Sequence, residues 1–197
     1  MQHLGIFVFD GVEVLDFAGP FEVFSVASQL SNYQTLKVFT FGADASLIRT
    51  VNGLQVLPDY GLQNLPYCDF LVIPGGVGSI KVIQQPEVLA SLKNTIDQTE
   101  WTMSVCSGSR ILGKLGLLDN RPFCTHRSTF ESMKDVAPSG IPKPELRFVQ
   151  SSELIYTAAG ISAGIDLSLF LVEQTFGLDL ARQTADWMEY LPYLNQP

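Results

Sequence analysis

The 197-residue sequence contains one cysteine, Cys106, in a pattern that is typical of a nucleophile. A predicted strand over residues 101–105 ends at this cysteine, and the small residues Ser107 and Gly108 leave room for a tight turn into a helix predicted over residues 107–117. A strand that turns at the nucleophile into a helix is a nucleophile elbow, here with sulfur in place of a serine oxygen. The N–H groups and the positive dipole end at the helix start would lower the pKa of Cys106 and favour its thiolate.

The alternative for Cys106 is a small buried hydrophobic side chain, which is what most free cysteines are. Its position between a strand, two small residues and a helix leads us to favour the nucleophile. Cys68 precedes a predicted strand, and Cys124 lies between Phe123 and Thr125, so neither has this context. We interpret both as packing residues.

Two glycines mark the end of a neighbouring predicted strand. Gly75 and Gly76 follow the apolar run 70–73 and Pro74. Their N–H groups could form an oxyanion hole that stabilises developing negative charge. An ordinary Pro-Gly-Gly turn is the alternative. Because adjacent parallel strands would bring the two motifs side by side, we expect these amides to bind substrate next to Cys106.

An aspartate and a histidine are the candidate proton-transfer groups. Asp16 lies among apolar neighbours in the loop expected after the first strand, and is either a helix cap or an acid of the site; burial would raise its pKa and a helix N-terminus would lower it. His126 could orient the thiolate or accept a proton, or be a hydrogen-bonded structural histidine. His3 begins the first predicted strand, at the wrong end of the sheet. Glu13 and Glu22 are interpreted as surface charges without a role.

Strands and helices alternate along the chain. Strands are predicted over 4–9, 37–41, 70–73, 101–105, 146–149 and 154–158, and helices over 86–99, 107–117, 162–176 and 178–188, with a further helix that has Pro20 in its first turn. Asn52-Gly53 predicts a hairpin within 46–57. This alternation predicts one α/β domain over residues 1–197, a doubly wound, mostly parallel sheet between helices with a small hairpin. Ligands of such sheets bind beyond the carboxyl ends of the strands, where Asp16, Gly75 and Cys106 fall.

Composition excludes several classes of protein. Twelve Lys and Arg against 20 Asp and Glu, a net charge of −8, offer no basic face for nucleic acid. No apolar run is long enough for a membrane span, and the N-terminus is not that of a signal peptide. Three cysteines are too few for a disulfide scaffold and indicate a reducing, cytoplasmic compartment. With two histidines, no ligand-spaced cluster and no phosphate-binding or dinucleotide motif, we expect neither metal nor cofactor.

The motifs resemble those of the ThiJ/PfpI superfamily, which shares the flavodoxin-like fold of class I glutamine amidotransferases. The resemblance covers nearly the whole chain and is carried by Leu15-Asp16-Phe17-Ala18-Gly19-Pro20, Ile73-Pro74-Gly75-Gly76, Val105-Cys106-Ser107-Gly108-Ser109, Thr125-His126 and Ala159-Gly160-Ile161-Ser162. The chain looks most like the isonitrile hydratase branch. The same strings recur in the effector domains of AraC-type transcription regulators.

The sequence also departs from several branches of that superfamily. Protease-like members place histidine after the nucleophilic cysteine, where this chain has Ser107. Deglycase and glyoxalase-like members carry glutamate where this chain has Asp16. Isonitrile hydratases usually show threonine and tryptophan where this chain has Ser107 and Arg127. The serine keeps the hydroxyl, whereas Arg127 removes an aromatic wall and leaves the substrate open.

The resemblance implies a hydro-lyase that converts an isonitrile and water into an N-substituted formamide without a cofactor. Cys106 would attack the isonitrile carbon, Asp16 would act as general acid and base, and Ser107 with the Gly75 and Gly76 amides would stabilise developing charge. His126 would complete the substrate site. Two alternatives are a small-molecule or oxidative-stress sensor without turnover, and a glyoxalase-like enzyme acting on reactive carbonyls.

The resemblance also implies a homodimer. The apolar stretch Asp186–Leu194 would lie near its contact, because large exposed apolar patches usually mark interfaces. The alternative is that this stretch folds back on its own sheet.

Overall fold

A seven-stranded sheet forms the centre of the protein in a computed structural model that describes residues 1–190. Its strands lie in the order β10-β11-β7-β6-β1-β2-β5, and all neighbours are parallel except β10 and β11. The strands are β1 (Gln2–Phe7), β2 (Leu36–Gly42), β5 (Tyr60–Gly61), β6 (Phe70–Ile73), β7 (Trp101–Ser104), β10 (Phe148–Gln150) and β11 (Ile155–Ala158). The predicted doubly wound, mostly parallel α/β fold is confirmed.

Two short ribbons stand apart from this sheet. The predicted hairpin around Asn52-Gly53 is present as antiparallel β3 (Ile48–Arg49) and β4 (Gln55–Val56). A second ribbon, β8 (Pro122–Phe123) with β9 (Ile141–Pro142), was not predicted. Strands of two residues are too short to produce a recognisable alternation of apolar and polar residues.

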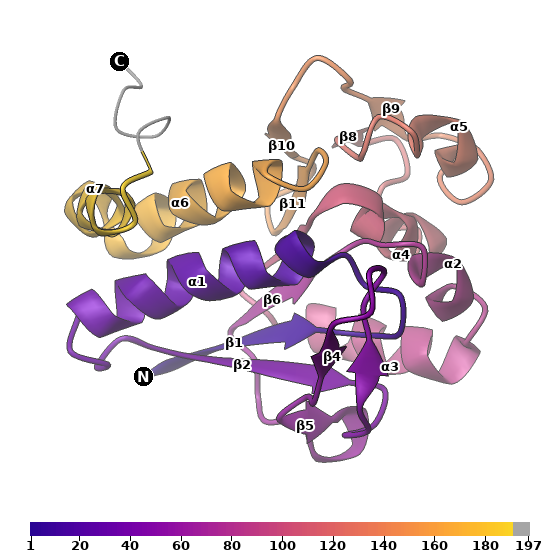
Figure 1. The fold of residues 1–197 in the computed structure, drawn as a ribbon. Coiled ribbons are helices and arrows are strands. Elements are labelled where there is room, and N and C mark those ends of the chain that lie inside the picture. Colours follow the sequence, from indigo (N-terminus) through magenta and orange to yellow (C-terminus); the bar gives the residue numbers. More distant parts are fainter. Residues whose placement is uncertain (191–197) are drawn as a thin grey trace.

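Helices cover both faces of the sheet. They are α1 (Val14–Leu30), α2 (Ser79–Val82), α3 (Pro86–Ile96), α4 (Ser109–Lys114), α5 (Phe130–Met133), α6 (Ala163–Phe176) and α7 (Leu178–Trp187), with 3₁₀ turns η1 (Leu62–Asn64) and η2 (Cys106–Gly108). α1, α6 and α7 pack together in one layer (Figure 1). The crossover from β1 to β2 runs along the sheet in the opposite direction to that from β6 to β7, so right-handed connections place α1 and α3 on opposite faces.

The central strands are buried because both of their faces are covered, and β6 is apolar throughout. Every residue of β6 and β7 is buried. Phe70 of β6 stacks on Trp101 of β7 with ring centroids 4.5 Å apart, and the Trp101 indole N–H donates to Thr175 Oγ1 on α6 at 3.1 Å. The two strands that lead into the candidate site are therefore fixed to each other and to the helix layer.

Helix α1 starts earlier than the sequence predicts. It begins at Val14, so Pro20 lies inside the helix and not in its first turn. An interior proline costs one helical hydrogen bond, but here tertiary contacts outweigh that cost. The Glu13 N–H donates to the Gly75 carbonyl at 2.9 Å, and Phe17, Pro20 and Phe24 are buried. Asp16 consequently lies in the first helical turn, not in a loop.

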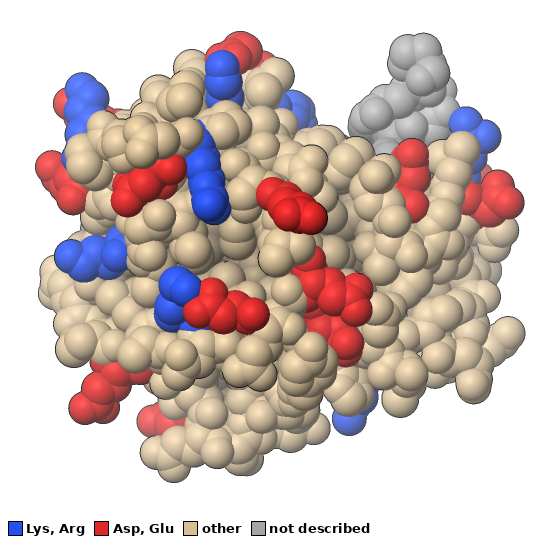
Figure 2. All heavy atoms as spheres, turned by 180° about the vertical axis from the view of Figure 1, so that it is seen from behind, with Lys and Arg blue, Asp and Glu red and all other residues tan. Residues whose placement is uncertain are grey.

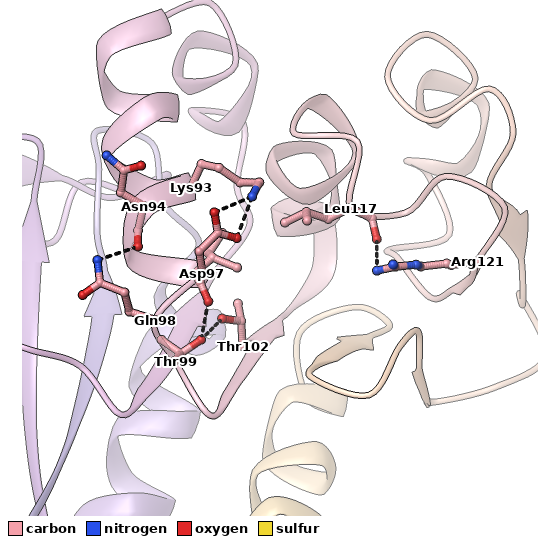
Figure 3. Close-up of polar contacts among 9 residues, drawn as sticks. Lys93, Asn94, Asp97, Gln98, Thr99, Thr102, Leu117 and Arg121 are labelled. Atoms are coloured by element: carbon pink, nitrogen blue, oxygen red, sulfur yellow. Dashed lines mark hydrogen bonds and ion pairs between the residues drawn. The ribbon is translucent and has the colours of Figure 1, made fainter.

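The end of α3 sets the start of β7, as Figure 3 shows. Lys93 pairs with Asp97 at 2.6 Å. Thr99 Oγ1 donates to the Ile96 carbonyl at 2.9 Å and lies 3.0 Å from Thr102 Oγ1 on the strand. The helix therefore ends at Ile96, three residues before the predicted end. The chain then enters β7, the strand that leads to Cys106.

One face of the protein carries its charges in a dispersed pattern (Figure 2). On the face opposite to that of Figure 1, basic and acidic side chains are interspersed over a mostly uncharged surface (Figure 2). Within residues 1–190, no helix combines the length and apolarity that a membrane crossing requires. The stretch expected at a dimer contact, Asp186–Leu194, lies outside the described residues from Leu191 onward; within them, Trp187 is 60% exposed and the Tyr190 hydroxyl donates to Asp166 at 2.7 Å.

Candidate active site

The predicted site residues Asp16, Gly75 and Cys106 converge at the carboxyl ends of neighbouring strands, and Ile161, which the sequence did not single out, joins them from a fourth strand. Ile161 follows β11, Cys106 follows β7, Gly75 follows β6, and Asp16 lies at the start of the helix that follows β1. Ligands of parallel α/β sheets bind at this edge. The topology therefore assembles, from four separate segments, the residues that the sequence placed at strand ends.

Cys106 has the backbone geometry of an elbow. Its φ of 57° lies in the left-handed region, which non-glycine residues rarely adopt. Two hydrogen bonds hold this conformation: the Cys106 N–H donates to the Ala159 carbonyl at 3.0 Å, and the Cys106 carbonyl accepts from Thr125 Oγ1 at 3.0 Å. Strain of this kind persists only where surrounding contacts impose it and clusters at functional sites.

Two glycines let the elbow approach the end of β6. A Cβ on Gly108 would lie 2.2 Å from the Ile73 carbonyl oxygen, and one on Gly75 would lie 2.5 Å from the Ser107 nitrogen. Both distances are far inside van der Waals contact. Gly75 and Gly108 are thus required by close packing of two backbone segments.

Asp16 is a buried acid that faces the Cys106 thiol. Its side chain is inaccessible to solvent, Oδ2 accepts from the Gly75 N–H at 3.0 Å, and Oδ1 has no conventional hydrogen-bond partner among the described residues. Burial raises the pKa of Asp16 from 3.8 to about 7, against the lowering effects of the Gly75 N–H and the Cys106 thiol, and the charge of Glu13 adds to the rise. The capping alternative is excluded, because Glu13 is the N-cap of α1 and Asp16 lies within the first turn.

Cys106 does not behave as an isolated low-pKa thiol. Its side chain is only 7% exposed, and burial together with the Asp16 charge raises the pKa of Cys106 to about 12, although the N–H groups of Ser107 and Ile161 lower it. The predicted depression of the Cys106 pKa by the helix start is wrong, because Cys106 lies in a 3₁₀ turn, α4 begins only at Ser109, and desolvation of the thiol exceeds the effect of the nearby N–H groups.

Asp16 and Cys106 titrate as one unit. Because the pKa of Asp16 is raised to about 7 and that of Cys106 to about 12, the pair carries one negative charge and one proton at pH values between them. A thiolate then forms by transfer of the proton from sulfur to carboxylate, without any change in the charge of the buried pair. This arrangement supplies a nucleophile and an acid together.

The pH dependence of alkylation tests this coupling. We expect iodoacetamide to modify Cys106 well before Cys68 and Cys124, at a rate that rises with a midpoint near pH 7 in the native protein. In Asp16→Asn the buried thiol has no acceptor for its proton, so the midpoint should move above about pH 9. Peptide mass spectrometry across pH 5–10 measures both; an unchanged midpoint in the variant, or equal labelling of all three cysteines, contradicts the coupling.

The Gly75 and Gly76 amides are not free oxyanion donors. The Gly75 N–H is engaged by Asp16 Oδ2, and the Gly76 N–H donates to Ser107 Oγ at 2.9 Å. The oxyanion-hole interpretation therefore fails on geometry. These amides position the acid and the serine, while the Ser107 and Ile161 amides interact with the sulfur.

Ser107 is tied to the backbone of the neighbouring strand end. Its hydroxyl accepts from the Gly76 N–H and donates to the Gly76 carbonyl at 3.2 Å. We expect Ser107→Ala to lower the free energy of unfolding by about 1–2 kcal/mol, because a part-buried N–H loses its acceptor. Any catalytic rate should fall by about tenfold or less, a smaller loss than we expect for Asp16→Asn. Urea unfolding measures the change in stability, and steady-state rates measure the change in activity. A loss of turnover equal to that of the Asp16 variant would contradict this positioning role.

A cavity of about 310 Å³ opens above the sulfur. Its wall consists of Glu13, Gly76, Val77, Ile80, Cys106, Ser107, Arg110, His126, Ser128, Thr129 and Ile161. His126 is part of this wall, but its Nδ1 lies 2.7 Å from Ser128 Oγ, and the described residues include no hydrogen bond from the ring to Cys106 or Asp16. The expectation that His126 orients the thiolate is not met by this geometry.

Three residues of this wall were missed or misjudged from the sequence. Glu13, interpreted as a surface charge, raises the pKa of Asp16. Ile161 has a φ of 48°, unusual for a β-branched residue, and its N–H faces the sulfur. The available signal for Ile161 was Gly160, the glycine that precedes it just after a predicted strand. For Arg110 the sequence offered no signal except that it is the one charged residue in the run 101–113.

The other cysteines and His3 lie where the sequence placed them. Cys68 and Cys124 are buried and free, and Cys68 lies before β6, at the opposite end of that strand from Gly75. His3 is at the start of β1, with Nδ1 3.2 Å from the Tyr67 carbonyl. In the part of the chain that the structure describes, no three His, Cys, Asp or Glu side chains are grouped as a metal site would require.

Comparison with known proteins finds the DJ-1/PfpI family over residues 3–174. The isonitrile hydratase of Pseudomonas putida is 29% identical over 190 residues, which cover 96% of this chain and 79% of that protein. The transcriptional regulator GbdR of Pseudomonas aeruginosa is 26% identical over 189 residues, and this chain spans about half of its length, 51%.

Among solved structures, a ThiJ/PfpI family protein from Pseudomonas syringae superposes with a TM-score of 0.86 at 26% identity. The match covers 96% of this chain and 75% of that one.

Proposed function

The chain belongs to the DJ-1/PfpI family, and from that premise we propose that it is a cysteine-dependent enzyme that adds water to an isonitrile to give an N-substituted formamide. One observation carries the proposal: a buried aspartic acid with a pKa of about 7 is paired with a cysteine in a strained elbow, at the base of a cavity large enough for a small molecule. The similarity to an isonitrile hydratase over 96% of the chain supports the choice of substrate.

The first half of the proposed reaction forms a bond to sulfur. The Cys106 thiol passes its proton to the Asp16 carboxylate, and the sulfur attacks the terminal carbon of R–N≡C. As the S–C bond forms, Asp16 returns its proton to that carbon. The product is the thioimidate R–N=CH–S–Cys106, which is covalently bound to the protein. The Ser107 and Ile161 amides, which interact with the sulfur, stabilise its charge before attack.

The second half releases the product. Asp16, again a carboxylate, takes a proton from water as the water oxygen attacks the thioimidate carbon, and the nitrogen then receives that proton. The C–S bond breaks with its electron pair on sulfur, which takes up the proton of the new hydroxyl group. R–NH–CHO leaves, and the thiol and carboxylate are restored. A group with a pKa near 7 serves as acid and base in one cycle at neutral pH.

Incubation with a simple alkyl isonitrile tests this proposal. We expect loss of the isonitrile infrared band together with the appearance of the formyl proton signal in NMR, in proportion to enzyme and absent with Cys106→Ala. Consumption of methylglyoxal without isonitrile turnover would replace the proposal with the glyoxalase-like alternative.

A second candidate is an effector domain that binds a small molecule without turning it over. The match to a transcriptional regulator of about twice this length favours it. Binding of an isonitrile, detected as a shift in melting temperature of native protein, with no formamide formed over several hours, would favour this alternative over the enzyme. Cytoplasmic location and a homodimeric state remain parts of the proposal, and the three free cysteines support the former.

A further inference from the structure

Arg110 is a fixed cation in the wall of the cavity that holds Cys106. It belongs to α4, the short helix after the elbow, and is partly buried. Its Nε and Nη2 donate to Ser132 Oγ at 3.3 and 3.0 Å, and its Nη1 donates to Ser79 Oγ at 3.1 Å. The guanidinium therefore has one orientation, set by helices α2 and α5.

The two serines that hold Arg110 are themselves anchored. Ser79 Oγ donates to the Gly76 carbonyl at 2.8 Å, and Ser132 Oγ donates to the Thr129 carbonyl at 2.8 Å. Each hydroxyl proton is thus directed to a backbone oxygen, and each lone pair is available to the guanidinium. The site is preorganised by neutral groups, which orient the cation without forming an ion pair with it, while the charge of Cys106 attracts it across the cavity.

Arg110 has no acidic partner within the described residues. The ion pairs found there join Lys93 to Asp97, Lys134 to Glu131 and Arg147 to Asp166. Glu13 lines the same cavity but forms no ion pair with Arg110. Three of the five guanidinium N–H groups are engaged with serines, which leaves two donors and a full positive charge next to the reacting sulfur.

From this arrangement we infer that the substrate carries a carboxylate and that Arg110 binds it while Cys106 attacks the reactive carbon. A planar guanidinium with two spare N–H groups matches a carboxylate in geometry and charge. The inference rests on Cys106 being the reacting group of the proposed function, and narrows its substrate to a small isonitrile with an acidic substituent.

The adjoining cavity also favours a negatively charged ligand. It has a volume of about 440 Å³, shares His126 and Ile161 with the first, and is lined by Arg127 and Arg147 but by no carboxylate. Asp166 forms an ion pair with Arg147. Exposed Arg127 has no partner within residues 1–190. Arg127 thus adds one unpaired positive charge farther from the sulfur, in a protein whose net charge is −8.

Two alkylating reagents of nearly equal shape test the inference without a substrate. Iodoacetate carries a carboxylate and iodoacetamide a neutral amide; in both, the thiolate displaces iodide as the S–C bond forms. The ratio of their rates at Cys106, relative to the same ratio in the urea-unfolded chain, should favour iodoacetate by at least about tenfold. In Arg110→Gln this preference should disappear, because the iodoacetate rate should fall by more than the iodoacetamide rate.

Further variants and a competitor separate charge recognition from a structural role. Arg110→Lys, which keeps the charge but loses the planar fork, should retain part of the preference. Arg182→Gln, on the exposed face of α7, should change nothing. In native protein, propionate should slow modification by iodoacetamide, whereas propionamide should not.

The outcomes differ for the inference and for the proposed function. Equal slowing of both reagents in Arg110→Gln would mean that Arg110 supports the sulfur or the fold, and no preference in native protein would mean that it binds no carboxylate; either overturns the inference. A strong iodoacetate preference without isonitrile turnover would retain the inference and overturn the hydratase. Failure of both reagents to modify Cys106 would overturn both.

Discussion

Replacing Cys106 with alanine is expected to reduce isonitrile hydration by at least about four orders of magnitude, since removal of a nucleophile removes the covalent pathway and leaves only binding and orientation. The fold should survive, because the substitution removes one buried sulfur at a strand end. The rate of formamide formation, followed by NMR, measures the effect. Native-like thermal unfolding of the variant would show that the loss is chemical.

The matched control is Cys68→Ala. It removes a sulfur that is similarly buried but lies just before β6, at the end of the sheet opposite to the site. It should leave turnover within about twofold, with a stability loss of about 1–2 kcal/mol. Cys106→Ser, which keeps the size of the side chain, should be nearly as inactive as the alanine variant. Turnover retained in both Cys106 variants would show that the cysteine is not the nucleophile.

Replacing Asp16 with asparagine is expected to lower turnover by about two to four orders of magnitude, as for loss of a general acid–base group. Asparagine keeps the shape, and its carbonyl oxygen can accept from the Gly75 N–H in place of Oδ2. It cannot take the thiol proton or return one. Steady-state rates between pH 6 and 9 measure this loss, and a loss below tenfold would exclude a proton-transfer role.

The same substitution should stabilise the folded protein above neutral pH. The pKa of Asp16 is 3.8 when exposed and about 7 in the fold, so between these values the folded state holds a proton that the unfolded state has released. The free energy of unfolding therefore falls as pH rises through this range, by about 4 kcal/mol at most. Asparagine has no charge to bury and escapes this loss.

Urea unfolding at pH 5 and pH 8 measures the stability effect. We expect Asp16→Asn to be more stable than the native protein by a clearly larger margin at pH 8 than at pH 5, because most of the loss in the native protein occurs between these two values. Glu13→Gln is a useful comparison, because it removes the nearby charge that raises the pKa of Asp16 but keeps the acid. A variant that is less stable than native protein at pH 8 would show that Asp16 is held for structural reasons.

Local patterns in the sequence were sufficient for the architecture. The buried strand 70–73 consists of adjacent apolar residues because both faces of the sheet are covered, and this signal does not depend on distant contacts. Strand-end position then identified Cys106, Asp16 and the glycine pair, because parallel strands present their carboxyl ends at one edge. The start of α1 was missed, since it depends on a hydrogen bond between Glu13 and Gly75, 62 residues apart.

The chemistry of the site depended on three-dimensional contacts. Whether Asp16 is acid or cap, and whether Cys106 has a low or a high pKa, is decided by desolvation and by one neighbour from another strand end, and neither is visible in a local string. The Gly75 and Gly76 amides changed from oxyanion donors to supports because Asp16 and Ser107 reach them first. Which residues meet at the sheet edge could be read from the sequence, because the apolar pattern and the order of the strands are local properties. Where the shared proton resides, how Arg110 is oriented and which N–H groups are free follow from the folded arrangement alone, because they depend on burial and on distances across the fold.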